Sequence, residues 1–503
     1  MLFNSLEFAV FLPIAFLLYW FVFDYALKRC RYQLQLQNAF IVVASYIFYG
    51  WWDWRFLLLI AFTSLCSWGS GLLIGARSSE QRPRAAKVWM TANIAVNLGI
   101  LAVFKYYDFF VSEFGQLFGI SQMTDSLLLR IILPVGISFY TFQALSYSID
   151  VYRKKIEPTK DIIAFFAFIS FFPQLVAGPI ERATNLLPQF LQKRTFNYDM
   201  AADGMRQILW GLFKKIVIAD NCATYVDQVW STYPTQSGGT LLLAAVLFTF
   251  QIYGDFSGYS DIAIGTAKLF GIKLMRNFNN PYFSRDIAEF WRRWHISLTT
   301  WFRDYVYIPL GGSRPEVPAT GIWASSPAKQ NAYKKLIIVR NTFVIFLLSG
   351  FWHGANWTFI AWGAYHALLF LPLILLGRNR KYTNQVAEGH ILPTWQEVVQ
   401  MLLTFALVVF GWIIFRAETI TQAWQYISCI TNTAPAFFAT TNLYPTIVLC
   451  IVMLVVEWLQ RNKQHGLEIK IKHWYVRYLI YVIIVCTIVY FYSDAVTFIY
   501  FQF

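Results

Sequence analysis

Charge is scarce in this sequence: of its 503 residues only 14% are Asp, Glu, Lys or Arg, whereas 57% are hydrophobic and 19% aromatic. Soluble domains carry about 25% charged residues. Apolar runs near the ~20 residues that cross a bilayer recur along the chain, and only short polar links separate them. This shortage excludes an ordinary soluble protein and predicts an all-α, polytopic integral membrane protein in a single domain, residues 1–503.

Cysteine is also rare, and the six cysteines lie far apart with no CxxC pair and no zinc-like spacing. We interpret them as small apolar residues and expect neither a disulfide framework nor a metal site. The sequence also lacks the GxSxG, HExxH, Walker and GxGxxG motifs. We therefore expect no bound cofactor. The cysteines are Cys30, Cys66, Cys222, Cys429, Cys450 and Cys486.

Positive charge is in excess, with a formal net charge of +14. The basic residues cluster in links between apolar runs and form no continuous face, which favours the positive-inside rule over nucleic-acid binding. The first run, residues 8–23, is followed by Lys28, Arg29 and Arg31 and preceded by no Lys or Arg. A secretory signal has the opposite polarity, so we expect a retained helix whose amino end is extracytoplasmic.

Alternation of cytoplasmic and outer links gives about 11–13 transmembrane helices with both termini outside. Residues 77–87 and 153–155 are predicted inside, and residues 112–129 and 222–239 outside. The run 161–178 contains Pro173 and Gly178 and breaks the alternation, so we interpret it as re-entrant. Further spans are expected near 205–221, 240–269, 336–352, 357–376, 399–415, 443–459 and 477–493. Residues 273–335 form an amphipathic section at the cytoplasmic side, which we expect to be the working part.

The stretch FWRRWHISLTTWFRDYVYIPLGG, residues 290–312, gathers charge around His295. On one continuous helix, an apolar stripe recurs at spacings of three and four residues, with His295 at its edge and Arg293 and Asp304 opposite. Pro309 is expected to end the helix. An interfacial helix that presents tryptophans to lipid headgroups explains this pattern equally well. The stripe consists of Trp291, Trp294, Leu298, Trp301 and Tyr305.

The second concentration is SGFWHGANWTFIAWGAYH, residues 349–366. His353 follows Trp352 at the end of an apolar run, and an ionisable residue in such a run is a functional candidate, although it can also simply cap a helix. Gly350 and Gly354 permit close approach, and the Asn356 amide is expected to hold one imidazole nitrogen of His353. We expect His366 to be a satisfied core residue on another helical face. His390, His465 and His473 fall in basic loops and are expected to be solvated.

A pair of histidines, His295 and His353, suits acyl transfer. A neutral imidazole takes the proton of an attacking hydroxyl because its pKa lies near working pH. Nearby arginines and tryptophans suit the phosphates and ring of a nucleotide-bearing thioester. The predicted substrate-binding residues are Trp352, Asn356, Trp294, Arg292, Arg293, Arg303, Asp304 and Tyr305.

These two long motifs resemble the membrane-bound O-acyltransferase (MBOAT) family, in the bacterial branch that includes the alginate O-acetylation membrane protein. LPVGISFYTFQALSYSIDVYR (133–153), FFPQLVAGPIER (171–182), QIYGDFSGYSDIAIG (251–265) and the closing FIYFQF support the resemblance, which covers nearly the whole chain. It implies helices around a central tunnel, with His353 as the catalytic histidine and His295 as a second important residue.

The resemblance also implies an acetyl group from cytoplasmic acetyl-CoA as co-substrate. The acetyl group is passed outward across the bacterial inner membrane for O-acetylation of an exopolysaccharide. A periplasmic or membrane-anchored SGNH-type partner is expected to complete the transfer. Besides this partner, the polysaccharide and membrane lipids are the expected partners, with no nucleic acid.

Three alternatives stay open from the sequence. One is D-alanyl transfer from a carrier protein to a teichoic-acid-type acceptor. Another is a transporter of polysaccharide or lipid-linked sugar, since histidines and broken helices also occur in proton-coupled carriers. The third is a scaffold in which the histidines are structural.

Overall fold

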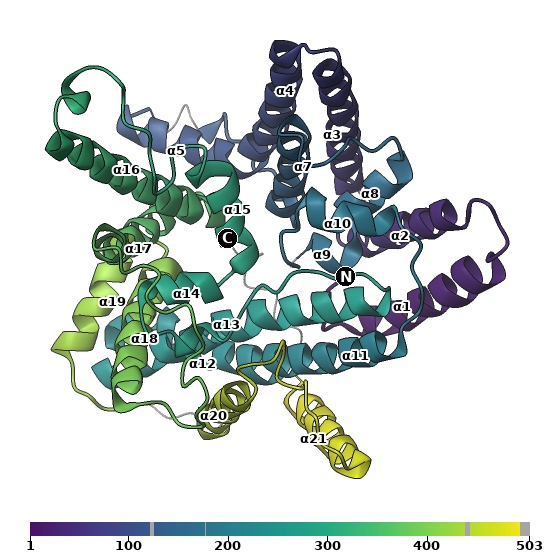
Figure 1. Cartoon of the computed structure of the whole chain (residues 1–503). Helices are drawn as coiled ribbons and strands as arrows, with labels where there is room; N and C mark the ends of the chain where they lie inside the picture. The colour runs from purple at the N-terminus through teal and green to yellow at the C-terminus, as the bar shows by residue number, and fades with distance from the viewer. Residues whose placement is uncertain (121–124, 177, 438–442, 493–503) are drawn as a thin grey trace. The chain divides into compact units, whose positions relative to one another are not determined.

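The computed structural model describes residues 1–120, 125–176, 178–437 and 443–492, and the regular elements in these ranges are helices (Figure 1). Lipid offers no hydrogen-bond partners, so an apolar sequence favours the helix, which satisfies its backbone groups internally. The predicted all-α fold is confirmed. The closing residues 498–503 lie outside the described ranges.

Eight helical segments among the described residues are long and apolar enough to cross a membrane. Six of them overlap runs named from the sequence, and Leu443–Leu459 is a shorter apolar helix at another predicted span. The span predicted near 205–221 is not among the eight. The larger count of 11–13 crossings and the outward orientation of both termini stay predictions. The eight segments are Leu6–Ala26, Phe56–Ser79, Pro83–Leu117, Gly238–Leu269, Pro327–His353, Trp357–Leu375, Trp395–Arg416 and Trp474–Phe491.

The chain divides into two compact units, and the division falls within the long helix α13 (Gly238–Leu269). Unit 1 comprises Met1–Gly211 with Tyr259–Met275, and unit 2 comprises Leu212–Gly258 with Arg276–Phe503. The helices of unit 1 are α1 (Leu6–Leu17), η1 (Leu18–Ala26), α2 (Gln33–Gly50), α3 (Phe56–Ser79), α4 (Pro83–Leu101), η2 (Ala102–Tyr106), α5 (Tyr107–Leu117), α7 (Ile137–Tyr152), α8 (Ile162–Ser170), α9 (Phe172–Leu175), α10 (Ala183–Phe190) and α11 (Tyr198–Leu212).

In unit 1, the helices α3, α4 and α7 pack side by side (Figure 1). Asn93 on α4 donates to the Ser148 hydroxyl on α7 at 2.6 Å, and the Ser67 hydroxyl on α3 donates to Asn93 Oδ1 at 3.3 Å. Lipid tails are as apolar as leucine, so hydrophobic burial alone does not pair helices in a membrane. These buried hydrogen bonds therefore fix how the three helices associate.

The predicted interruption in residues 161–178 is confirmed. Helix α8 ends at Ser170, and Phe171, with ψ 106°, separates it from the four-residue α9. At 1.5 Å per residue, the nine residues of α8 extend only about 14 Å, far short of the ~30 Å hydrocarbon core. Both helices are largely buried within the protein, which is the setting that an interrupted backbone requires.

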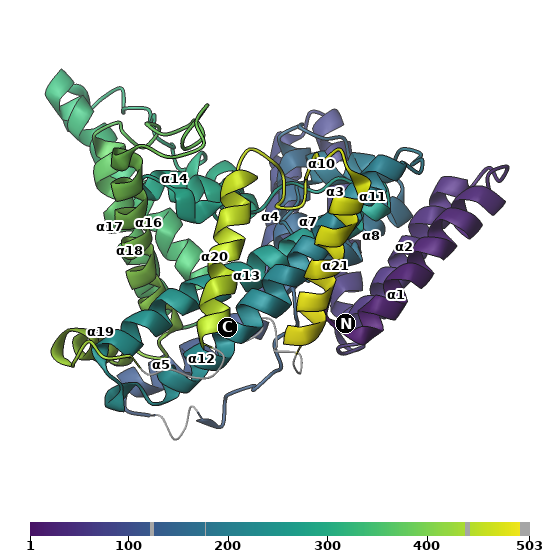
Figure 2. The same ribbon diagram turned by 90° about the horizontal axis from the view of Figure 1, so that it is seen from below.

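Unit 2 contains the histidines of both motifs. In it, α16, α17 and α18 lie side by side (Figure 2), and Lys215 joins η3 to α12 and α13 by ion pairs of 2.7 Å to Asp220 and 2.8 Å to Asp255. The helices of unit 2 besides α13 are η3 (Phe213–Ala219), α12 (Asp220–Ser231), η4 (Tyr233–Thr235), η5 (Pro281–Phe283), α14 (Ile287–Arg293), α15 (Ile296–Phe302), η6 (Arg303–Tyr307), η7 (Ile322–Ala324), α16 (Pro327–His353), α17 (Trp357–Leu375), α18 (Trp395–Arg416), α19 (Ile420–Asn432), α20 (Leu443–Leu459) and α21 (Trp474–Phe491).

Candidate active site

His353 is the last residue of α16. Gly354 follows with an extended backbone, φ −172° and ψ 159°, and only three residues separate α16 from α17. This short link makes α16 and α17 a helical hairpin, and close packing continues along it. A Cβ on Gly350 would lie 2.1 Å from the Phe359 carbonyl oxygen, and one on Gly363 would lie 2.3 Å from that of Phe346. The predicted close approach at the glycines is thus confirmed, and it sets the position of His353.

Three aromatic rings surround the His353 imidazole. The ring centroids of Trp352, Trp362 and Phe415 lie 4.9, 5.3 and 5.2 Å from that of His353. His353 itself is 4% exposed. The imidazole therefore lies in a largely apolar environment.

The predicted hydrogen bond between the Asn356 amide and the His353 imidazole is wrong, because Asn356 has other partners. Its Oδ1 accepts from the backbone N–H of Thr358 at 3.0 Å, and its Nδ2 donates to the carbonyl of Glu418 at 2.9 Å. An Asn before a helix is a strong N-cap because its side chain satisfies a free backbone N–H. The amide therefore caps α17 and links it to the end of α18, where the sequence suggested a contact with His353.

The predicted continuous helix around His295 is also wrong. Trp294 has an extended backbone, φ −98° and ψ 129°, and His295 is left-handed with φ 43° and ψ 53°, so α14 ends at Arg293 and α15 begins at Ile296. The predicted stripe is nonetheless buried, because each half packs inward separately. The expected end near Pro309 is confirmed, since η6 stops at Tyr307.

The break places His295 in the interior of unit 2, where it is 1% exposed. Its Nδ1 lies 3.0 Å from Asn277 Oδ1, and the rings of Phe256, Phe278 and Trp352 lie 4.6, 6.3 and 5.7 Å from its ring. Burial lowers the pKa of His295 to about 3. The imidazole is thus neutral at physiological pH.

Trp352 connects the two histidines, because its ring contacts both the His295 and the His353 rings. The two histidines that the sequence paired therefore lie around one tryptophan. Trp294 joins the same aromatic cluster through Trp412, at 5.0 Å between ring centroids, and Trp412 stacks on Trp362 at 5.7 Å. In the described part of the chain, no three His, Cys, Asp or Glu side chains gather closely enough to hold a metal ion.

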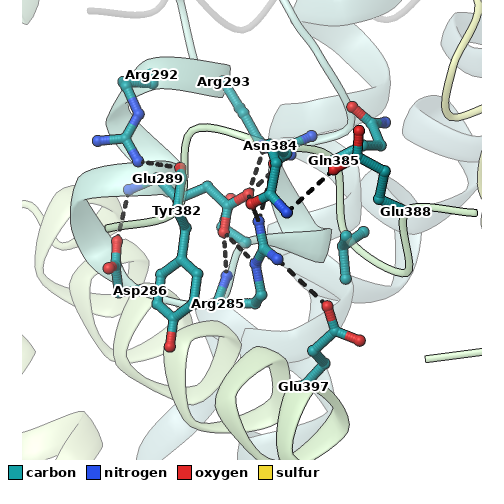
Figure 3. A network of polar contacts seen from close by, with 12 residues as sticks. Arg285, Asp286, Glu289, Arg292, Arg293, Tyr382, Asn384, Gln385, Glu388 and Glu397 are labelled. Atoms are coloured by element: carbon teal, nitrogen blue, oxygen red, sulfur yellow. Dashed lines mark hydrogen bonds and ion pairs between the residues drawn. The ribbon is translucent and has the colours of Figure 1, made fainter. Parts of the chain in front are cut away.

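The arginines beside His295 have partners inside the protein (Figure 3). Glu289, whose side chain is 1% exposed, pairs with Arg293 at 2.7 Å and with Arg285 at 3.0 Å. Arg285 continues to Glu397 at 3.2 Å and to the carbonyl of Asn384 at 2.9 Å. This network fastens α14 to the link between α17 and α18.

Arg292 belongs to the same anchorage. Its guanidinium donates to the carbonyl oxygens of Asn379 and Tyr382, at 2.5 and 2.6 Å. Both guanidinium groups thus hold protein segments together, and the binding of a donor by Arg292 and Arg293 stays a prediction. The positive charge strengthens the hydrogen bonds of Arg292 to the two carbonyls and the ion pair of Arg293 with Glu289.

Arg303, Asp304 and Tyr305 lie together on η6. The Arg303 Nε donates to Asp304 Oδ1 at 2.7 Å, and the Arg303 side chain is 58% exposed. Tyr305 is buried against Trp301, at 5.0 Å between ring centroids. Of the three arginines predicted to bind a donor, Arg303 is the one whose charge faces solvent.

Sequence reasoning missed several neighbours of the two histidines. Asn277 lies 18 residues before His295, and only its place in the polar run RNFNNP marks it in an apolar chain. Trp362 and Phe415 are ordinary aromatic residues of apolar helices, so no sequence signal distinguishes them. Their contacts exist only in the folded chain.

The remaining histidines are partly as predicted. His366 is buried, but its ring lies 4.9 Å from that of Trp362, which also contacts His353. Its Nδ1 makes no hydrogen bond to any described residue, so the prediction of a satisfied core histidine holds only for its burial. His390 and His473 are exposed, whereas His465 is 5% exposed, which corrects the prediction that it is solvated.

Comparison with known proteins identifies the family. Residues 154–322 match the model of MBOAT, the membrane-bound O-acyltransferase family. The probable alginate O-acetylase AlgI of Pseudomonas aeruginosa is 40% identical over 426 residues, 84% of this chain and 74% of that protein. The peptidoglycan O-acetyltransferase of Helicobacter pylori is 32% identical over 514 residues, 92% of this chain and 90% of that protein.

A more distant similarity is to the teichoic acid D-alanyltransferase of Bacillus subtilis, 29% identical over 56% of this chain and 69% of that protein. The extent of the first two similarities, together with the eight apolar helices, decides the assignment. The chain belongs to the membrane-bound O-acyltransferase family and is a multi-pass integral membrane O-acyltransferase.

Proposed function

We propose that the protein moves an acetyl group from a cytoplasmic thioester, acetyl-CoA, across the bacterial inner membrane for O-acetylation of an extracytoplasmic polysaccharide of the alginate type. Its similarity to proteins named as alginate and peptidoglycan O-acetylating enzymes supports the acetyl group and the polymer. The observation that carries the chemistry is the arrangement of His295, Trp352 and His353 as three contacting rings in a buried aromatic cluster.

In the proposed reaction His353 is the general base. A hydroxyl oxygen of the acceptor attacks the thioester carbonyl carbon, a C–O bond forms, and the C–S bond breaks. The hydroxyl proton passes to the neutral imidazole and then to the departing thiolate, so no net proton is consumed. A thioester is already activated, and the step needs no covalent enzyme intermediate.

His295 assists this step as the second neutral imidazole. Trp352 lies between the two imidazole rings. This arrangement lets His353 contact the acceptor hydroxyl while His295 contacts the thioester. The aromatic surroundings exclude water, which would otherwise hydrolyse the thioester. The solvent-facing charge of Arg303 suits the phosphates of the donor.

The experiment uses purified full-length protein in lipid nanodiscs with [acetyl-¹⁴C]acetyl-CoA and an O-deacetylated polyuronate, with and without an SGNH-type acetyltransferase. We expect labelled polymer or labelled partner with the wild type, and a loss of at least about 100-fold in His353→Ala. His390→Ala, which changes an exposed histidine, is the matched control and keeps full activity. Equal melting temperatures of the variants exclude unfolding as the cause.

Transfer of label by His353→Ala at the wild-type rate contradicts the general-base role. The sibling reaction, D-alanyl transfer, is tested in the same nanodiscs with a D-alanyl-charged carrier protein. Labelling by the carrier alone overturns acetyl-CoA as the donor. In cells, loss of polymer export with normal acetylation in His353→Ala supports a transporter instead.

A further inference from the structure

Asn277 makes four hydrogen bonds around His295. Its backbone carbonyl accepts from the Ile296 N–H at 2.8 Å. Its side-chain oxygen, Oδ1, lies 3.0 Å from His295 Nδ1 and accepts from the Ser297 hydroxyl at 2.9 Å and the Ser297 N–H at 3.3 Å. Asn277 is itself fully buried, so these contacts form away from water.

These contacts decide which His295 nitrogen carries the proton. A backbone N–H only donates, so the Asn277 atom that faces Ser297 is the amide oxygen and not the nitrogen. The same oxygen lies 3.0 Å from His295 Nδ1, and the Ser297 hydroxyl, 3.4 Å from Nδ1, donates its hydrogen to that oxygen at 2.9 Å. Nδ1 therefore donates to the Asn277 oxygen as well, and Nε2 keeps its lone pair. His295 Nε2 makes no hydrogen bond to any residue that the structure describes.

Asn277 also holds the backbone of the break between α14 and α15. A left-handed φ of 43° costs a non-glycine residue roughly 1–3 kcal/mol, which the surroundings must offset. Two backbone hydrogen bonds do so: Ile296 N–H to the Asn277 carbonyl, and Asn279 N–H to the Arg293 carbonyl at 2.9 Å. The orientation of the imidazole thus depends on the segment that carries Asn277.

The charged groups near His295 are engaged elsewhere. On the α13 side, Asp255 pairs with Lys215 at 2.8 Å. On the α14 side, Arg293 pairs with Glu289 at 2.7 Å. On α16, Trp352 contacts both His295 and the titratable ring of His353. The Asn277 amide is therefore the polar side chain that sets the state of His295.

We infer that Asn277 is a positioning residue that keeps His295 as the Nδ1–H tautomer and so presents an unprotonated Nε2 for acyl transfer. This inference rests on the proposed function for its effect on catalysis. It does not depend on that function for the tautomer itself. Two kinds of measurement therefore test it.

The first measurement follows kcat and KM against pH for Asn277→Ala and Asn277→Asp. The alanine variant loses the acceptor, so we expect kcat to fall roughly 100-fold with KM unchanged. The aspartate variant keeps the acceptor and adds a negative charge, which raises the pKa of His295. Since His295 must be neutral to assist the transfer, the acid limb of the kcat profile of this variant moves at least one pH unit higher, while kcat at pH 8 stays within about tenfold of wild type.

Asn432→Asp is the control, because it makes the same Asn-to-Asp change at an exposed position on α19, away from the hydrogen bonds around His295. We expect it to leave kcat and the pH profile unchanged. A purely structural role for Asn277 predicts reduced protein yield and no shift of the acid limb in Asn277→Asp. That result, or unaltered kinetics in both Asn277 variants while wild type transfers acetyl, overturns the inference.

The second measurement needs no activity. With ring-¹⁵N histidine, the protein gives signals from only six histidines, and His295→Gln identifies the pair from His295. We expect a protonated Nδ1 and a bare Nε2 in the wild type, and loss of this preference in Asn277→Ala. A wild-type Nε2–H tautomer refutes the inference even if acetyl transfer is never detected, whereas an inactive protein with the expected tautomer refutes only the proposed function.

Discussion

At the scale of single residues, Arg292 and Arg303 belong to the same motif but make different contacts. Arg292 donates to two backbone carbonyls, whereas the side chain of Arg303 is 58% exposed and pairs with its neighbour Asp304. Hydrogen bonds from a charged donor contribute about 1.5–3 kcal/mol each, and exposed ion pairs contribute about 0–1 kcal/mol. Their sequence context is the same, so only the fold distinguishes them.

Opposite effects are predicted for the two alanine variants. Arg292→Ala should lower the free energy of unfolding by about 2 kcal/mol, seen as a lower melting temperature in detergent, with KM for the donor unchanged in the folded fraction. Arg303→Ala should leave stability within about 0.5 kcal/mol and raise KM for acetyl-CoA. A raised KM in Arg292→Ala at wild-type stability contradicts the anchoring role.

At the scale of elements, the α16–α17 hairpin determines where His353 lies. The glycines on both helices let the backbones meet, because a side chain there would occupy the same space as a carbonyl of the facing helix. At the break between α14 and α15, the left-handed backbone of His295 and the backbone hydrogen bonds beside it determine where the His295 ring lies. Both histidines thus lie at helix ends, where small backbone shifts move a ring most.

Gly350→Ala tests the hairpin. The new Cβ would lie 2.1 Å from the Phe359 carbonyl, so α17 must move and the variant should lose about 1–3 kcal/mol of stability and most acetyl transfer. Gly99→Ala on α4 is the control, since nothing lies within 4 Å of its new Cβ. Alanine there should be neutral or stabilise by up to about 1 kcal/mol. Equal activity of both variants would show that the hairpin spacing does not matter.

At the scale of the whole molecule, the distribution of basic residues predicts orientation in the membrane. The end of α3, the link after it and the start of α4 carry Arg77, Arg82 and Arg84, and the link between α12 and α13 carries no Lys or Arg. Cytoplasmic links retain the excess of positive charge. The two links should therefore face opposite sides.

Labelling of single introduced cysteines tests this orientation, in a variant from which the six native cysteines have been removed. Ser79→Cys and Thr235→Cys are both exposed positions. In intact spheroplasts a membrane-impermeant maleimide should label Cys at 235 and spare Cys at 79, which becomes labelled only after lysis. Labelling of both positions before lysis, or the reverse pattern, contradicts the predicted topology.

The sequence by itself determined the membrane class, the helical fold and the positions of the apolar helices, because lipid permits few backbone structures and hydropathy accumulates over ~20 residues. It also predicted His295 and His353 as candidate site residues, since ionisable residues in apolar runs are rare. It failed at the backbone break at His295 and at the partner of Asn356, and it did not predict the carbonyl and carboxylate partners of Arg292 and Arg293. Nothing local distinguishes a guanidinium or an amide that binds a substrate from one that binds a distant carbonyl.

Only the tertiary structure decided which polar groups meet. Asn277 and His295 are 18 residues apart, and Arg292 meets carbonyls about 90 residues away. Such pairs form because a buried donor or acceptor without a partner is costly, and the fold alone determines which partner comes within reach. Hydrophobic periodicity can predict a helix. The position of the proton on His295 depends on the Asn277 amide, which lies outside that periodic segment.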